Sequence, residues 1–260
     1  MDDNIQIHFD SGARYPFIPE SEVIVSICER NSPEKKHVLE LNSHVLVKYR
    51  NVSLEECRNQ IEARKLLDPE IVYVPLVYRY FSKGLQNYLV MELVEGIERD
   101  TIEDDQSITK VAEAISHLRE FQSNTPGPLG GGRSRGLFWE NEETKLESKS
   151  RLEEYINRRL VGEQSGRQFK VNELVMNHND IAPRNIIWMS NRSICLLDWS
   201  SAGYYPRLLE LVVLLFNTQQ SKDFEFARLL QQKLGPLTCD EEKEKSMMHM
   251  AWFNSHRYKM

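Results

Sequence analysis

Segment 178–185 (HNDIAPRN) holds the densest group of polar side chains in the sequence. Asn185 follows Asp180 by five residues, and Asp198 follows Asp180 by eighteen. Two short apolar runs separate Asn185 from Asp198, and a hairpin formed by these runs would bring both side chains to one end. Carboxylate and amide oxygens suit Mg²⁺, which completes its coordination with water and phosphate oxygens. The pattern therefore predicts that three oxygen-bearing side chains converge on a site suited to Mg²⁺.

The first third of the chain has strand-like segments around one helical segment. Residues 1–20 contain Pro16 and Pro19 and predict an irregular lead-in. Apolar residues at helical spacing predict one helix over 54–67. β-branched or alternating apolar residues predict strands at 22–28, 37–41, 45–49, 77–81 and 88–94. These segments predict a sheet with one inserted helix.

The rest of the chain is mainly helical. A flexible, glycine-rich segment is expected at 125–135. The apolar pattern predicts helices near 108–121, 150–160, 208–216 and 224–234, and short strands at 174–177, 186–189 and 194–197. We therefore predict an α+β fold with a β-rich N-lobe (1–94) and a mainly helical C-lobe (95–260).

Composition limits the class of protein. The 260 residues are 40% hydrophobic and 28% charged, with a net charge of −6. An acidic chain argues against binding the phosphate backbone of nucleic acids, which requires dense Lys and Arg. No apolar run approaches the roughly 20 residues of a membrane helix, and the four cysteines form no CxxC pair. We expect a cytoplasmic protein without a membrane span and with reduced thiols. Its oligomeric state stays open.

The polar segment also carries a family resemblance. H-x-D-x-x-x-x-N followed by an Asp on the next hairpin is similar to the catalytic loop of the kinase superfamily. The string 178–185, with 197–199 (LDW) and 202–206 (AGYYP), resembles the aminoglycoside phosphotransferase and choline kinase branch. It is most similar to a large fungal set of phosphotransferase-family proteins. The resemblance covers residues 22–216 and implies a two-lobed, protein-kinase-like fold.

This resemblance implies a role for each matching residue. Asp180 would be the catalytic base, or orienting group, for the acceptor hydroxyl. Asn185 and Asp198 would hold Mg²⁺. Lys48 occupies the position of the phosphate-contacting lysine, and Glu62 would be its partner on the inserted helix.

Residues 88–96 (YLVMELVEG) resemble the hinge that binds adenine. The Glu92 carbonyl and the Val94 N–H would face the adenine edge, with Met91 behind it. The implied cofactors are ATP, or GTP, and Mg²⁺. The implied partner is a small molecule with an acceptor hydroxyl.

Taken singly, these residues have ordinary structural explanations. Lys48 suits a solvated strand edge, Glu62 a helix surface, and Met91 a core position. Their order and spacing together favour the kinase-like interpretation. One departure is the phosphate-covering loop, expected at 29–36, which contains no glycine to let the backbone approach phosphates.

The sequence leaves more than one function open. Only 62 residues follow Asp198 and no Ala-Pro-Glu string occurs, which favours a small-molecule kinase over a protein kinase. The alternative is a non-catalytic, pseudokinase-like protein that binds a nucleotide or another ligand, and the glycine-free loop favours it. A metal hydrolase would leave Lys48 and the hinge without a purpose.

Overall fold

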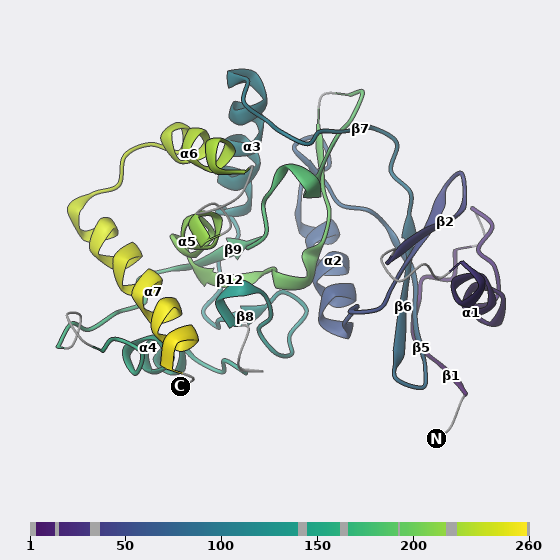
Figure 1. The fold of residues 1–260 in the computed structure, drawn as a ribbon, viewed down its shortest axis with the longest axis horizontal. Coiled ribbons are helices and arrows are strands. Elements are labelled where there is room, and N and C mark those ends of the chain that lie inside the picture. Colours follow the sequence, from purple (N-terminus) through teal and green to yellow (C-terminus); the bar gives the residue numbers. More distant parts are fainter. Residues whose placement is uncertain are drawn as a thin grey trace.

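A five-stranded antiparallel sheet lies at one end of the computed structural model, in the order β1-β5-β6-β3-β2 (Figure 1). The structure describes residues 4–13, 16–31, 37–139, 145–161, 166–191, 193–216 and 223–258. The strands are β1 (Ile5–Asp10), β2 (Val38–Asn42), β3 (Val45–Tyr49), β5 (Val77–Lys83) and β6 (Gln86–Glu92). The strands predicted near β2, β3, β5 and β6 are confirmed.

Helices α1 (Ser21–Arg30) and α2 (Leu54–Leu66) cover opposite faces of this sheet (Figure 1). Successive side chains of a strand point to opposite faces. Val45 and Val47 therefore lie in the cluster with α1, while Lys48 belongs to the α2 face. The inserted helix predicted over 54–67 is α2, so the strand–helix–strand order around Lys48 is confirmed.

The strand predicted at 22–28 is wrong, because this segment forms α1. Its buried residues Ser21, Ile24, Val25 and Cys28 recur at helical spacing, and they pack on the sheet. The pattern of burial therefore outweighs the β propensity of the Val and Ile side chains.

The irregular lead-in predicted for 1–20 contains a strand instead. Strand β1 pairs with β5 along the sheet edge, with Ile5 opposite Lys83. Most of its residues are exposed, so the strand buries no continuous face. Without a buried face, an edge strand lacks the alternation of apolar and polar residues by which strands are predicted.

Two small sheets join the five-stranded sheet to the helices. One has the order β4-β11-β10-β7 and the other has the order β8-β12-β9. Their strands are β4 (Val72–Tyr73), β7 (Ile97–Glu98), β8 (Gly127–Pro128), β9 (Leu174–Asn177), β10 (Ile186–Trp188), β11 (Ile194–Leu196) and β12 (Gly203–Pro206). β10 and β11 form the predicted hairpin, in which Ile186 lies opposite Leu196. This register brings Asn185 and Asp198 to the same end of the hairpin.

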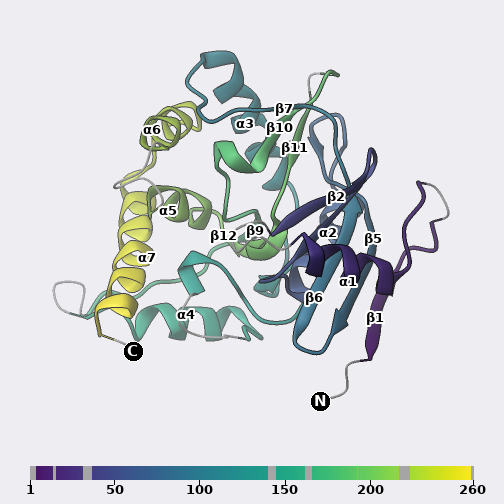
Figure 2. The same ribbon diagram turned by 45° about the vertical axis from the view of Figure 1, so that its right-hand side comes forward.

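The remaining helices form the other side of the molecule (Figure 2). They are α3 (Asp105–Leu118), α4 (Lys149–Asn157), α5 (Leu209–Phe216), α6 (Phe224–Lys233) and α7 (Cys239–Tyr258). Helices were predicted near α3 to α6, whereas α7 was not. The largest clusters of buried side chains lie around α3 and around α5, and the second includes Met248 and Ala251 of α7.

The glycine-rich segment predicted as flexible packs closely on α2. A Cβ atom at Gly130 would collide with the backbone of Arg58, and one at Gly132 would crowd Glu55. These glycines allow close approach of two backbones.

Among the described helices, none combines the length and apolar character needed to cross a membrane. Cys28, Cys57, Cys195 and Cys239 are all free thiols.

Candidate active site

Lys48 brings together the sheet, α2 and the hairpin of the C-terminal part. Its Nζ lies 2.6 Å from Glu56 Oε1 and 3.1 Å from Asp198 Oδ2. The Glu56 side chain is 1% exposed, and the Lys48 side chain is 17% exposed. Lys48 and the two carboxylates form a mostly buried charged cluster where the sheet, α2 and the hairpin meet.

The predicted ion pair between Lys48 and Glu62 is wrong. Glu62 pairs with Lys65 at 2.7 Å, and both side chains are exposed. Glu56 and Glu62 lie six residues apart on one helix, so their side chains point about 120° apart around the helix axis. Only one of them can therefore face β3, and the structure places Glu56 there.

The charges around Lys48 shift one another's pKa values. Burial would lower the pKa of Lys48, but Glu56 and Asp198 raise it above its ordinary value. Burial raises the pKa of Glu56 to about 7, against the opposing effect of Lys48. Burial also favours the neutral form of Asp198, yet Lys48 and Ser200 hold its pKa below the ordinary value. Asp198 is therefore the more firmly ionised carboxylate of the two.

The catalytic-loop candidates Asp180 and Asn185 are in direct contact. Asn185 Nδ2 donates to the backbone oxygen of Asp180 at 2.9 Å and to Asp180 Oδ2 at 2.8 Å. Arg184 Nη2 lies 2.5 Å from Asp180 Oδ1. Burial raises the pKa of Asp180, and Asp198 acts in the same direction, whereas Arg184 opposes both. These bonds hold the Asp180 carboxylate in a defined direction.

A second layer of buried side chains supports this loop. His178 Nδ1 accepts the Asp180 N–H at 3.3 Å, so Nε2 carries the proton that is donated to the Leu197 carbonyl at 3.0 Å. Burial lowers the pKa of His178 to about 4. His178 is therefore a neutral structural residue of the loop.

Glu210, on α5, is a support that the sequence did not indicate. Its carboxylate accepts the backbone N–H of His178 at 2.6 Å and that of Asn179 at 2.9 Å and 3.0 Å. Asn179 has φ +60°, a left-handed conformation that Asn tolerates well. Burial raises the pKa of Glu210 to about 7, although the two N–H groups act to lower it. In the sequence, Glu210 stands out only as an acidic residue at the start of an apolar helix.

Asn59 is a further missed residue, and it ties α2 to the segment after Asp198. It is fully buried, and its Nδ2 donates to the carbonyls of Trp199 and Ala202, each at 3.0 Å. Its Oδ1 accepts the Gly130 N–H at 3.0 Å. A polar residue on the inward face of an amphipathic helix was its only signal.

The donor set at the hairpin end fits a Mg²⁺ ion. Asp198 Oδ1 is buried without a hydrogen-bond partner among the described residues. Asp198 has φ +61°, which for a residue other than glycine is uncommon and occurs at functional sites. Asn185 donates both of its hydrogen bonds to Asp180 from Nδ2, so its Oδ1 takes part in neither of them. The described part of the chain contains no cluster of three His, Cys, Asp or Glu, so the remaining ligands would be water and phosphate.

The hinge candidates continue from the end of β6. Met91 is 8% exposed, and its sulfur accepts from Gln60 Nε2 at 3.4 Å. The Glu92 carboxylate accepts from the Tyr73 hydroxyl at 2.7 Å and from a backbone N–H at 2.9 Å, so this side chain is structural. Val94 follows the strand, and its N–H forms no hydrogen bond with a described residue.

The phosphate-covering loop expected at 29–36 is partly helical. Glu29 and Arg30 form the end of α1, and Asn31 caps that helix. Residues 32–36 lie outside the described residues.

Solved structures with a similar fold were found. A thermostable mutant of aminoglycoside phosphotransferase APH(4)-Ia in a ternary complex with ADP and hygromycin B has a TM-score of 0.56 and 12% identity, covering 92% of this chain and 91% of that chain. The apo form of such a mutant has a TM-score of 0.55 and 14% identity, covering 85% and 82%. A streptomycin–ATP complex of APH(2")-IIa has a TM-score of 0.51 and 14% identity, covering 88% and 86%. These likenesses confirm the predicted kinase-like fold.

No curated protein matches this sequence. The expected closeness to the fungal set stays a prediction. The family model described as "Phosphotransferase enzyme family" matches residues 28–243, which is well over half of the chain. The chain therefore belongs to the phosphotransferase enzyme family.

Proposed function

We propose that this protein transfers the γ-phosphoryl group of ATP, or GTP, to a hydroxyl group of a small molecule in a Mg²⁺-dependent reaction. The observation that carries the proposal is the position of Lys48, 2.6 Å from Glu56 and 3.1 Å from Asp198. Residues 1–94 would supply the lysine and the adenine contacts, and residues 95–260 the catalytic loop and metal ligands.

Lys48 would bind the phosphates of the nucleotide. Phosphoryl transfer depends mainly on positioning and on neutralising charge at the phosphate oxygens. Glu56 keeps the Lys48 side chain extended toward Asp198, and its charge keeps Lys48 protonated. Glu56 thus takes the role first assigned to Glu62, which points elsewhere.

Asp180 would orient the acceptor hydroxyl and accept its proton. Its carboxylate is held by Asn185 and Arg184 and is 23% exposed, so a hydroxyl group can approach it. Burial raises its pKa, which makes it a better proton acceptor than an ordinary Asp.

Asp198 and Asn185 would hold Mg²⁺ through Asp198 Oδ1 and Asn185 Oδ1. When bound, the ion would neutralise negative charge on the phosphate oxygens. The unpaired state of buried Asp198 Oδ1 supports this assignment.

The adenine edge would bind to the backbone after β6. The Glu92 carbonyl and the Val94 N–H would form these hydrogen bonds, with Met91 packed behind the base. The lack of a described partner for the Val94 N–H supports this part of the proposal.

The experiment combines turnover with binding. We would measure Mg²⁺-dependent nucleotide consumption by the full chain with a panel of aminoglycosides, amino alcohols and sugars. Calorimetry would then follow the binding of Mg²⁺–ATP to the parent, Asp198→Asn and Asp180→Asn. Asp198→Asn should weaken Mg²⁺-dependent binding, whereas Asp180→Asn should leave binding nearly intact and lower turnover by about 10²–10⁴-fold.

Two results would count against the proposal. Equal loss of binding in both variants would show that the roles of Asp180 and Asp198 are divided wrongly. Tight Mg²⁺–ATP binding without transfer to any acceptor would favour the pseudokinase-like alternative, in which Asp180→Asn has no turnover to lose.

A further inference from the structure

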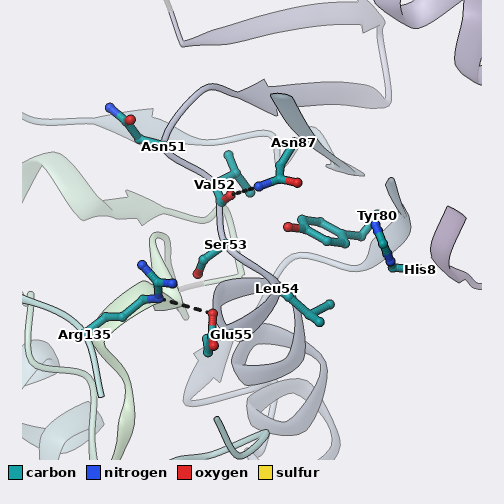
Figure 3. Close-up of a pocket in the computed structure, with 9 residues that line it drawn as sticks. All are labelled: His8, Asn51, Val52, Ser53, Leu54, Glu55, Tyr80, Asn87 and Arg135. Carbon is teal, nitrogen blue, oxygen red and sulfur yellow. Dashed lines mark hydrogen bonds and ion pairs between the residues drawn. The ribbon is translucent and has the colours of Figure 1, made fainter. Parts of the chain in front are cut away.

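A pocket lies on the side of α2 where the helix begins (Figure 3). Its volume is about 530 Å³, within the range of small-molecule sites. Its walls come from β1, the segment before α2, β5, β6 and the glycine-rich segment. Its lining residues include Ser53, Leu54, Glu55, Tyr80 and Arg135.

Tyr80 directs an unpaired hydroxyl group into this pocket. The residue is 2% exposed, and Figure 3 shows its hydroxyl turned toward the segment that carries Val52 and Ser53. This hydroxyl forms no hydrogen bond with a described residue. The hydroxyl opens onto the pocket and has no partner there in the described part of the chain, so the geometry leaves a donor for a ligand.

Further donors surround the Tyr80 hydroxyl. The N–H groups of Leu54 and Glu55 occupy the first turn of α2, where no intrahelical acceptor exists. Arg135 lies at the opposite wall, with its Nε 3.2 Å from Glu55 Oε2 (Figure 3). A helix N-terminus beside a guanidinium and a hydroxyl suits an anionic oxygen group.

Glu55 is the one carboxylate on the pocket wall, and it competes for Arg135. The Arg135 side chain is 42% exposed, and exposed ion pairs contribute little to stability. An oxyanion from solution can therefore replace Glu55 as the partner of Arg135.

Glu55, on the pocket wall, directly precedes Glu56 of the candidate active site. Ser53 Oγ accepts the Glu56 N–H at 3.1 Å, and this bond fixes the start of α2. The same Glu56 pairs with Lys48. A group bound at the first turn of α2 would hold Glu56 in its position beside Lys48.

We propose that this pocket is an effector site for a small organic oxyanion, a carboxylate or a phosphate, and that its occupation stabilises the Lys48–Glu56 pair. Binding itself is independent of the proposed function, whereas the effect on turnover rests on it.

The test is calorimetric titration of the full chain with malonate and with inorganic phosphate, without Mg²⁺. Arg135→Gln should weaken binding at least about tenfold, because a charge-assisted hydrogen bond is lost. Tyr80→Phe should weaken it about fivefold. Glu55→Gln should instead strengthen binding, because it removes the competing carboxylate. Arg133→Gln, on the same loop but outside the pocket lining, and Tyr88→Phe, on the α1 face of the sheet, are the matched controls.

Binding of either probe with this pattern of variants supports the site, and the difference between the probes identifies the preferred oxyanion. Failure of both probes to bind, equal affinity in the parent and Arg135→Gln, or weaker binding in Glu55→Gln would overturn it. Arg135 and Glu55 are partly exposed, so these variants decide the matter even if Tyr80→Phe does not fold.

A second measurement follows nucleotide turnover below saturation. Malonate should lower the KM for the nucleotide in the parent and leave Arg135→Gln unchanged. A parent without any turnover would count against the proposed function, while the binding data still decide the effector site. Turnover that malonate leaves unchanged, although malonate binds as expected, would overturn the link to Lys48 and Glu56.

Discussion

Two buried carboxylates, Glu56 and Glu210, stand behind opposite sides of the candidate active site. Burial raises the pKa of each to about 7. Glu56 contacts the charged end of the Lys48 side chain and leaves Oε2 without a described partner. Glu210 accepts two backbone N–H groups with both of its oxygens. The sheet side is thus held by an ion pair between two side chains, and the loop side by hydrogen bonds to the backbone.

The largest expected effect is on the Lys48 side of the site. Lys48→Ala should lower kcat/KM by about 10²–10³-fold, because it removes a charge aimed at the phosphates. Glu56→Gln should lower it by about tenfold, since Asp198 still holds Lys48. Glu62→Gln is the matched control on the same helix and should leave kcat/KM unchanged. A larger loss in Glu62→Gln than in Glu56→Gln would reverse the assignment of the partner.

On the Glu210 side of the site, a substitution should mainly lower the stability of the fold. Glu210→Ala would leave the buried N–H groups of His178 and Asn179 without acceptors, at about 1–3 kcal/mol each. We expect the free energy of unfolding to fall by about 3 kcal/mol or more in urea titrations. Glu225→Ala, at an exposed position, is the control and should leave it nearly unchanged. A stable Glu210→Ala variant with normal turnover would contradict the comparison.

Much of the site but not all of its pairing could be predicted from the sequence. Asp180, Asn185 and Asp198 lie within one loop and one hairpin, so local spacing determines that they converge. The partner of Lys48 depends instead on the rotation of α2 against β3, which is a tertiary contact. Glu56 and Glu62 are chemically equal, and only packing distinguishes them.

The fold likewise has elements that local sequence patterns predict and elements that depend on tertiary contacts. Helices with one buried face were predicted near α3 to α6, because their apolar residues recur at helical spacing. Strand β1 has no buried face, and α7 is rich in charged residues, so neither gives a strong signal. Glu210 and Asn59 act through neighbours far away in the chain, and their roles became visible only in three dimensions.

A third expected effect uses the buried histidine of the loop. The pKa of His178 is lowered to about 4, so the folded protein binds fewer protons than the unfolded chain between about pH 4 and 6.5. The stability that neutral His178 contributes is complete above pH 6.5 and is lost as the pH falls toward 4. His178→Gln should be less stable than the parent at pH 7, and the gap should narrow by about 3 kcal/mol at pH 4.

Thermal unfolding of both proteins across this range is the measurement. The carboxyls of Glu56 and Glu210 titrate with the opposite sign, because their raised pKa values favour the folded state at low pH. Both proteins contain these carboxyls, so their contribution cancels when the stability of the variant is subtracted from that of the parent. A gap that stays constant with pH would show that His178 is not held neutral.

The smallest expected effect lies at the hinge. Val94→Pro removes a backbone N–H donor, which should weaken nucleotide binding about fivefold. Val94→Ala keeps the donor and should bind as the parent does. Equal binding by both variants, measured by calorimetry, would remove Val94 from the nucleotide site.

Two neighbouring amides of α2 tie the helix to two distant segments of the chain. The Asn59 carboxamide donates to the Trp199 and Ala202 carbonyls, and the Gln60 carboxamide donates to the Pro75 carbonyl at 2.8 Å. Both side chains are buried, so neither bond exchanges readily with water. Helix α2 is therefore a rigid tie between the Pro75 segment and the Trp199–Ala202 segment. We expect these two segments to move together with the helix.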